Sequence, residues 1–197
     1  MEKFIISRIE ESIVLKQKII DNKELLKNLA LLTEACIRCF KEGGKVLFCG
    51  NGGSAADAQH LSAELSGRFY FDRPPLPSEA LHVNTSFLTA VANDYAYEEV
   101  FARMVHAIGN KVDVLIGLST SGNSTNILRA IEAANEKGMT TAAFTGETGG
   151  KLKNLVHYLI NVPSNDTPRI QEAHILLGHI LCEQIEKELF IKPSHPQ

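Results

Sequence analysis

The sequence has no tryptophan, few aromatic residues and no long apolar run. Aromatic side chains make up 7% of its 197 residues. A membrane-spanning helix needs roughly 20 consecutive apolar residues, and the apolar stretches here are shorter, so we expect no membrane partner. The N-terminal stretch MEKFIISRIEESIVLKQK contains acidic residues throughout and no small-residue cleavage site, so we expect no secretory signal.

An excess of charge of one sign is also absent. Twenty Lys and Arg residues face 23 Asp and Glu residues, which leaves a formal net charge of −3. Proteins that bind nucleic acids usually present a basic face, so we expect no nucleic-acid partner. This charge balance also provides no general attraction for anions.

Cysteine is scarce, with four residues in the whole chain. Cys36 and Cys39 have the C-x-x-C spacing of a redox or zinc pair. However, they lie within a helical pattern, lack a second pair and do not follow a strand. We therefore interpret the cysteines as small buried apolar residues of a protein in the reducing cytoplasm.

The remaining composition is that of one globular domain, with 44% apolar residues. Residues 1–42 show apolar positions at helical spacing, as at Ile5, Ile9 and Ile13, and predict a helical pair that ends at Gly43. One small sheet does not cover the apolar faces of this pair, so we expect the pair to pack between subunits.

Downstream of residue 42, short apolar segments alternate with helical patterns, which predicts βαβ units with right-handed crossovers. The predicted fold class is α/β, a three-layer, doubly wound, flavodoxin-like sheet of about five parallel strands over residues 43–190, with a tail at 191–197. The predicted strands cover residues 45–50, 80–83, 112–119, 140–146 and 157–163, and the predicted helices cover 54–68, 86–92, 97–108, 123–137 and 167–189.

Two glycine- and serine-rich loops each follow a predicted strand and precede a predicted helix. They span residues 50–54 (GNGGS) and 119–124 (STSGNS). Ligands of open parallel sheets bind at the carboxyl ends of the strands, where backbone N–H groups, helix N-termini and hydroxyls can hold a phosphate. Helix capping and a tight turn explain either loop alone equally well. The pair at neighbouring strand ends favours a phosphate site without lysine.

The first loop also fits the loose G-x-G-x-x-A fingerprint of dinucleotide-binding proteins. That interpretation requires an acidic residue at the end of the next strand, and the predicted strand 80–83 is followed by Asn84 and Thr85 instead. It also leaves the serine-rich loop without a role. We therefore rank a dinucleotide site below a phosphate site.

Two predicted helices carry groups that could perform chemistry. His60 and Glu64 are four residues apart and share one helix face, which is typical of a surface salt bridge but also suits a metal or acid–base site beside the first loop. On the last helix, periodicity places Glu172 nearer the face of His179 than Gln171. His174 points elsewhere and is interpreted as a packed or exposed residue.

The segments GNGGSAADAQHLSAELSGRF, the Asn93-Asp94 pair, STSGNS and PRIQEAHILLGHI together resemble the phosphoheptose isomerases, which belong to the sugar isomerase (SIS) domain proteins. The resemblance runs from about Ile5 to Phe190. It implies a homotetramer and the isomerisation of sedoheptulose 7-phosphate to D-glycero-D-manno-heptose 7-phosphate through a cis-enediolate. This is the first step toward the heptose of bacterial lipopolysaccharide or capsule.

The resemblance also implies site residues. A zinc ion would be bound by His60, Glu64, Gln171 and His179, and Glu64 and His179 would act as the acid–base pair. Pro168 stands where some relatives carry Asp, so a contact from that Asp does not carry over. The implied substrate-binding residues are Asn51, Gly52, Gly53, Ser54, Glu64, Asn93, Asp94, Ser119, Thr120, Ser121, Ser124 and Gln171.

A binding module is the alternative interpretation. Some SIS-domain relatives bind the DNA replication initiator without catalysing isomerisation, and they keep the glycine and serine loops but lack the Glu and the second His. This chain has both Glu64 and His179, which favours the enzyme.

Overall fold

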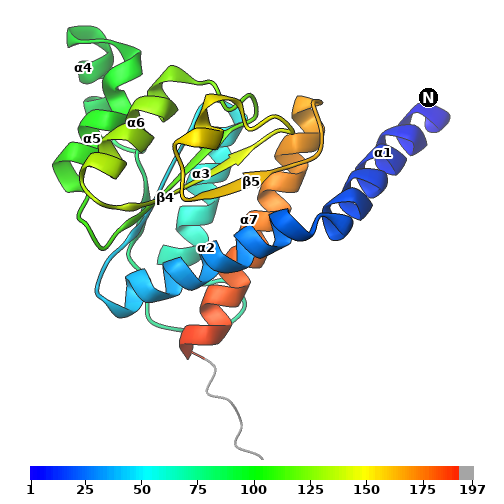
Figure 1. Cartoon of the computed structure of the whole chain (residues 1–197), viewed down its shortest axis with the longest axis horizontal. Helices are drawn as coiled ribbons and strands as arrows, with labels where there is room; N and C mark the ends of the chain where they lie inside the picture. Colours follow the sequence, from blue (N-terminus) through cyan, green and yellow to red (C-terminus); the bar gives the residue numbers. More distant parts are fainter. Residues whose placement is uncertain (191–197) are drawn as a thin grey trace, which may run out of the picture.

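Five parallel strands form the centre of the structure, a computed structural model that describes residues 1–190 (Figure 1). The strand order is β2-β1-β3-β4-β5, so the predicted doubly wound α/β fold is confirmed. The predicted tail at 191–197 lies outside the described residues. The strands are β1 (Val46–Gly50), β2 (Ser78–Ala80), β3 (Val114–Ser119), β4 (Thr140–Thr145) and β5 (Tyr158–Asn161).

Helices cover both faces of the sheet (Figure 1). Successive residues of a strand point to opposite faces, so Phe48 belongs to one core and its neighbour Leu47 to the other. The first core lies under α2 (Lys23–Lys41), α3 (Gly53–Ser66) and α7 (Thr167–Phe190), and the second lies under α4 (Thr85–Asp94), α5 (Val100–Ile108) and α6 (Thr125–Glu136).

The winding of the chain reverses between β1 and β3, which are neighbours in the sheet. The helix that follows β1 packs on one face, whereas the helix that follows β3 packs on the other. At such a reversal the two connecting loops diverge and leave a crevice at the carboxyl ends of the strands. The loop at residues 50–54 (the glycine loop) follows β1 and the loop at residues 119–124 (the serine loop) follows β3, so the two loops lie where the winding reverses.

The N-terminal helical pair forms as predicted. α1 (Glu2–Asp21) projects away from the rest of the molecule (Figure 1), and Asn22 caps α2 by accepting a hydrogen bond from the Leu25 N–H, at 3.1 Å. The isoleucines that predict α1 are exposed, with 53% of Ile5 and 59% of Ile13 accessible to solvent. The periodicity therefore identifies the helix, but this apolar face is uncovered in the single chain.

The second strand differs from its prediction. β2 covers Ser78–Ala80, whereas the apolar run at 80–83 continues into a turn after Ala80. β2 is an edge strand that pairs only with β1, so hydropathy is a weak guide to its limits. β2 ends at Ala80, and Glu79 lies level with Leu47 in the middle of β1. No acidic residue therefore stands at the carboxyl end of β2, and the argument against a dinucleotide site is unchanged.

Two other predictions have clear outcomes. The helix predicted at 97–108 is divided into a 3₁₀ turn, η1 (Tyr97–Glu99), and α5. The four cysteines are free and buried, as interpreted, and burial raises the pKa of Cys39 and Cys182 to about 12. No helix among residues 1–190 has the length and apolar character needed to cross a membrane.

α7 is joined to β4 through a buried histidine. His174 has no solvent-accessible surface, and its Nε2 lies 3.1 Å from the carbonyl oxygen of Thr145. A carbonyl only accepts, so Nε2 carries the proton, and Nδ1 has no hydrogen-bond partner within the described residues. Burial lowers the pKa of His174 to about 4, although the bond to Thr145 acts in the opposite direction.

We expect mild acid to destabilise the wild-type chain more than a His174→Gln variant, whose amide keeps a donor toward Thr145 but does not titrate. The unfolded histidine binds a proton near pH 6.5 and the folded one near pH 4, so the free energy of unfolding falls as the pH drops through this window. Between pH 7 and 5 the wild type should lose about 2 kcal/mol more than the variant. Urea denaturation with a metal chelator present measures this difference, and equal losses would contradict the buried neutral state.

Candidate active site

The glycine loop joins β1 to α3 at the crevice. Gly52 has a φ of +57°, a conformation that residues with a side chain rarely adopt. At Gly53 an added Cβ would lie 2.6 Å from Nε2 of Gln171. Gly52 therefore requires glycine, whereas a side chain at Gly53 would have to displace the flexible end of Gln171. The loop presents its backbone at the start of α3, where the first N–H groups have no partner within the helix. Ser54 is buried in the first turn of that helix.

The serine loop joins β3 to α6. The hydroxyls of Ser119 and Ser124 lie 3.0 Å apart, and Ser121 is exposed. Ser124 occupies the N-cap position of α6 but its side chain makes no capping hydrogen bond. Helix capping therefore does not account for this hydroxyl. A cavity of about 290 Å³ lies beside Thr120 and Ser121, and its wall also includes the acidic side chain of Glu147.

A pair of asparagines joins the two loops. Asn51 and Asn126 each donate one hydrogen bond to the other, and both N···O distances are 2.9 Å. The hydroxyl of Tyr97 donates a third bond to Oδ1 of Asn51, at 3.1 Å. Asn126 lies on α6 and is buried, so the pair fixes the glycine loop relative to the helix that follows the serine loop. Sequence inspection identified Asn51 but neither Asn126 nor Tyr97, which belong to no motif.

His60, Glu64 and His179 converge at the contact between α3 and α7. Nε2 of His60 lies 3.0 Å from Oε1 of Glu64 and 3.0 Å from Nε2 of His179. The ring of Phe69 packs beside His179, with ring centroids 5.6 Å apart. The structure therefore brings His179 next to His60 and Glu64, although 119 positions separate His60 from His179 in the chain.

A close approach of the two helices explains this convergence. An added Cβ at Gly178 would lie 2.5 Å from Cδ1 of Leu61, so α7 approaches α3 most closely where it carries no side chain. His179 and His60 are the immediate neighbours of these two residues. Their side chains consequently meet at the edge of the contact.

The prediction from periodicity for Glu172 is wrong. Glu172 forms an ion pair with Arg169, whereas the amide of Gln171 lies against Gly53 at the start of α3. The face of α7 that meets α3 includes Gln171 and, seven residues later, Gly178. Periodicity relates positions on one helix to one another but does not say which of them face a second helix.

Other predicted residues have looser placements. Asn93 and Asp94 are exposed at the end of α4, and within the described chain their side chains bond to each other, at 2.9 Å. Pro168 is the second residue of α7, where proline is well tolerated. Asp57, which the sequence did not single out, lies one turn before His60. Burial raises the pKa of Asp57 above its usual value, and the nearby His60 makes this rise smaller.

The chemistry of the converging atoms suits a zinc ion. Two imidazole nitrogens and a carboxylate oxygen lie within 4.8 Å of one another, and ligand atoms around a tetrahedral zinc are roughly 3.3 Å apart. The carboxylate oxygen offers a lone pair, and so does Nε2 of each histidine when the ring is neutral with its proton on Nδ1. His60, Glu64 and His179 therefore have the donor chemistry and the approximate spacing of a zinc site.

Comparisons with known proteins identify the family of the chain. The SIS domain family matches residues 10–146. The chain is 50% identical to a phosphoheptose isomerase of Aneurinibacillus thermoaerophilus, with 96% of each chain covered. It is 51% identical to one of Clostridium acetobutylicum, with 96% of this chain and 97% of the relative covered.

A solved structure of a phosphoheptose isomerase from Neisseria gonorrhoeae superposes with a TM-score of 0.88 at 42% identity, covering 94% of this chain and 98% of that chain. Another, from Francisella tularensis, superposes with a TM-score of 0.89 at 40% identity, covering 94% and 97%. Both structures share the fold of this chain and also about 40% of its sequence, so the relationship is not limited to the fold. This chain belongs to the phosphoheptose isomerase family of SIS domain proteins.

Proposed function

We propose that this chain is an aldose–ketose isomerase that converts D-sedoheptulose 7-phosphate to D-glycero-D-manno-heptose 7-phosphate for bacterial heptose biosynthesis. The observation that carries the proposal is the convergence of His60, Glu64 and His179 on helices that border the glycine and serine loops. An acid–base group beside a phosphate-binding crevice is what a sugar-phosphate isomerase needs. The names of the relatives support the same substrate.

Binding of the phosphate is assigned to groups without a formal charge. The phosphate would accept hydrogen bonds from Ser119, Thr120, Ser121 and Ser124 and would lie near the N-terminus of α6, where the helix dipole favours an anion. The sugar hydroxyls would contact the remaining predicted set, which is Asn51, Gly52, Gly53, Ser54, Glu64, Asn93, Asp94 and Gln171. Specificity would then come from hydrogen-bond geometry, because the chain has no general attraction for anions.

Proton transfer is assigned to Glu64 and His179. The reaction removes a proton from C1 of the ketose, passes through a cis-enediolate and returns a proton to C2. Glu64 would abstract the C1 proton, since its carboxylate is partly sheltered, with 23% of the side chain exposed. His179 would move protons among the substrate oxygens and assist ring opening.

The proposed metal is zinc, held by His60, Glu64, Gln171 and His179. When bound, it would polarise the substrate carbonyl as a Lewis acid. Gln171 joins the set through the resemblance, since its amide lies against Gly53, seven residues before His60 on α3. An amide is also a weak zinc ligand. Glu64 is assigned both as ligand and as base, and the two roles compete for the same lone pairs.

The binding-module alternative is not favoured. Its relatives lack the Glu and the second His, whereas here Glu64 and His179 lie around a common neighbour, His60. The relatives at about half identity are phosphoheptose isomerases across nearly their full length.

We also propose that the chain forms a homotetramer in the cytoplasm, with residues 1–42 at the subunit contacts. α1 supports this because its apolar side chains remain exposed, including 55% of Ile9 and 63% of Ile20. An exposed apolar patch of this kind is typical of an interface between protein chains.

The first test is an isomerase assay on the purified chain with sedoheptulose 7-phosphate. We expect Glu64→Gln and His179→Gln each to lower kcat at least about a hundredfold, since a positioned acid or base contributes roughly 10²–10⁴ in rate. Assays after chelation and after adding zinc back separate loss of metal from loss of the proton-transfer group. Turnover close to that of the wild type in either variant would contradict the assigned role.

Substrate binding is tested by thermal unfolding. The substrate should raise the Tm, because a ligand that binds only the folded state stabilises it. Ser121→Ala combined with Ser124→Ala removes two hydroxyls from the serine loop and should reduce this rise. An undiminished rise in the double variant would refute the assignment of the phosphate to this loop.

The subunit contact is tested by light scattering at micromolar concentration, where we expect a tetramer. Ile9→Glu places a charge on the exposed apolar face of α1 and should yield smaller species. Lys18→Gln changes the net charge by the same amount at an exposed position on the opposite side of this helix, nine residues after Ile9, and should leave the tetramer intact. A wild-type monomer would contradict the proposal.

A further inference from the structure

Two charged side chains that belong to no motif are almost completely buried next to the proposed active site. Only 2% of the Arg73 side chain and 1% of the Glu186 side chain are exposed. Arg73 lies in the loop after α3, and Glu186 lies on α7. Burying an ion pair is unfavourable unless further hydrogen bonds satisfy both groups, so the partners of this pair indicate what it holds in place.

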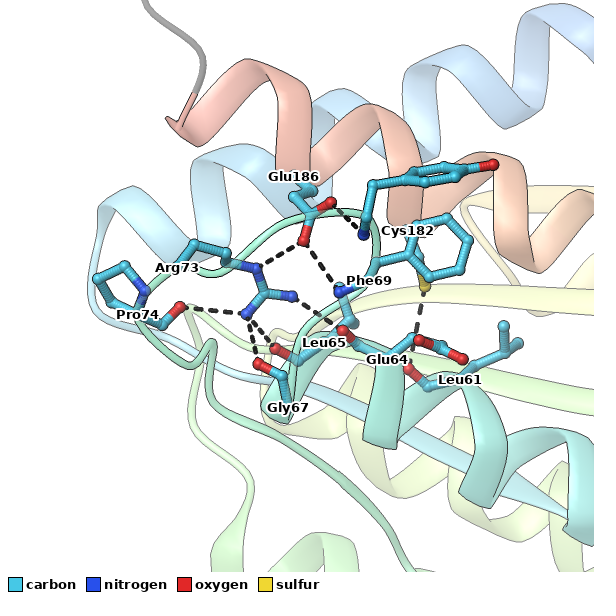
Figure 2. Close-up of polar contacts among 10 residues, drawn as sticks. Leu61, Glu64, Leu65, Gly67, Phe69, Arg73, Pro74, Cys182 and Glu186 are labelled. Atoms are coloured by element: carbon cyan, nitrogen blue, oxygen red, sulfur yellow. Dashed lines mark hydrogen bonds and ion pairs between the residues drawn. The ribbon is translucent and has the colours of Figure 1, made fainter.

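Arg73 binds the end of α3 (Figure 2). Its Nη2 donates to the carbonyl oxygen of Glu64 at 2.8 Å, and its Nη1 donates to those of Leu65 at 2.7 Å and Gly67 at 3.2 Å. The last carbonyls of a helix lack partners within the helix, and a cation there also complements the helix dipole. Arg73 therefore fixes the turn of α3 that carries Glu64.

Glu186 binds the loop from the other side. Its Oε1 accepts the Phe69 N–H at 3.0 Å and Nε of Arg73 at 3.0 Å, and its Oε2 accepts the Tyr70 N–H at 2.8 Å. Burial raises the pKa of Glu186, but the two N–H groups and Arg73 together bring it below its usual value. The carboxylate therefore stays charged and holds the backbone at Phe69.

This network leads to the histidines. Glu186 follows His179 by seven residues, about two helical turns, so both project from nearly the same side of α7. The backbone N–H of Phe69 is bonded to Glu186, and the ring of Phe69 packs beside His179. The network thus restrains Glu64 through its carbonyl and His179 through the ring beside it.

We propose that the buried Arg73–Glu186 pair is a positioning element of the active site, which holds Phe69 against His179 and Glu64 at its place on α3. The proposal rests on the proposed function for the roles of these two residues. Groups that orient metal ligands without touching the metal typically contribute 10- to 100-fold to affinity or activity.

The matched control is the Lys45–Asp113 ion pair beside the starts of β1 and β3, in which the carboxylate is buried and the lysine side chain is 26% exposed. Asp113, 1% exposed, immediately precedes β3. Its carboxylate accepts the backbone N–H of Lys45 at 2.9 Å, the N–H of Asn110 at 2.8 Å and Nζ of Lys45 at 2.7 Å. Asp113→Asn and Glu186→Gln therefore remove the same kind of charge and comparable hydrogen bonds, but only Glu186 lies near the histidines.

The zinc-loaded wild type and both variants are assayed below the lowest Tm of the three. We expect Glu186→Gln to lower kcat by 10- to 100-fold with KM changed less than about threefold, because the substrate loops are not touched. Zinc affinity, measured by competition with a chromophoric chelator without substrate, should weaken about tenfold. Asp113→Asn should keep both within about twofold of the wild type, despite a lower Tm. Unchanged values in Glu186→Gln, or equal losses in Asp113→Asn, would overturn the proposal.

Phe69 provides the decisive comparison if Glu186→Gln does not fold. Phe69→Leu keeps the backbone bond to Glu186 but removes the ring and should lower kcat and zinc affinity, whereas Phe69→Tyr keeps the ring and should retain both. Wild-type values in Phe69→Leu would refute the positioning role. A wild-type chain without isomerase activity would refute the proposed function instead, and the zinc affinities would still test the pair.

Discussion

The close contact between α3 and α7 is the constraint on which the rest of the site depends. Gly178 lets α7 approach the side chain of Leu61, and the flanking residues His60 and His179 meet only because the helix axes are this close. The same contact places the amide of Gln171 at the start of α3. A larger residue at position 178 would separate the groups that together form the proposed proton-transfer and zinc site.

The second constraint is the reversal of winding between β1 and β3. It creates a crevice without any special residue, and the two loops then need only small side chains and free backbone groups to bind an anion. Asn51 and Asn126 hold these loops in register. Under the proposed function, a chain with a net charge of −3 would bind a phosphorylated sugar through local donors rather than through its overall field.

The strength of local signals explains which predictions agreed with the structure. Buried strands such as β3 are apolar throughout, and the long helices have clear periodicity, so their positions were predicted closely. β2 pairs on one edge only and was misplaced by its hydropathy. Glu172 was favoured over Gln171 because periodicity describes one helix, whereas the partner of each face depends on how two helices cross.

The sequence by itself determined the α/β architecture, the two loops and the candidate groups His60, Glu64 and His179, because each follows from short-range patterns or from a recognisable motif. Only the tertiary structure decided which face of α7 meets α3, that Ser124 does not cap its helix, and that Arg73 and Glu186 form a buried pair. These features depend on contacts between segments more than a hundred residues apart or on side-chain orientation, and neither is encoded in a local pattern.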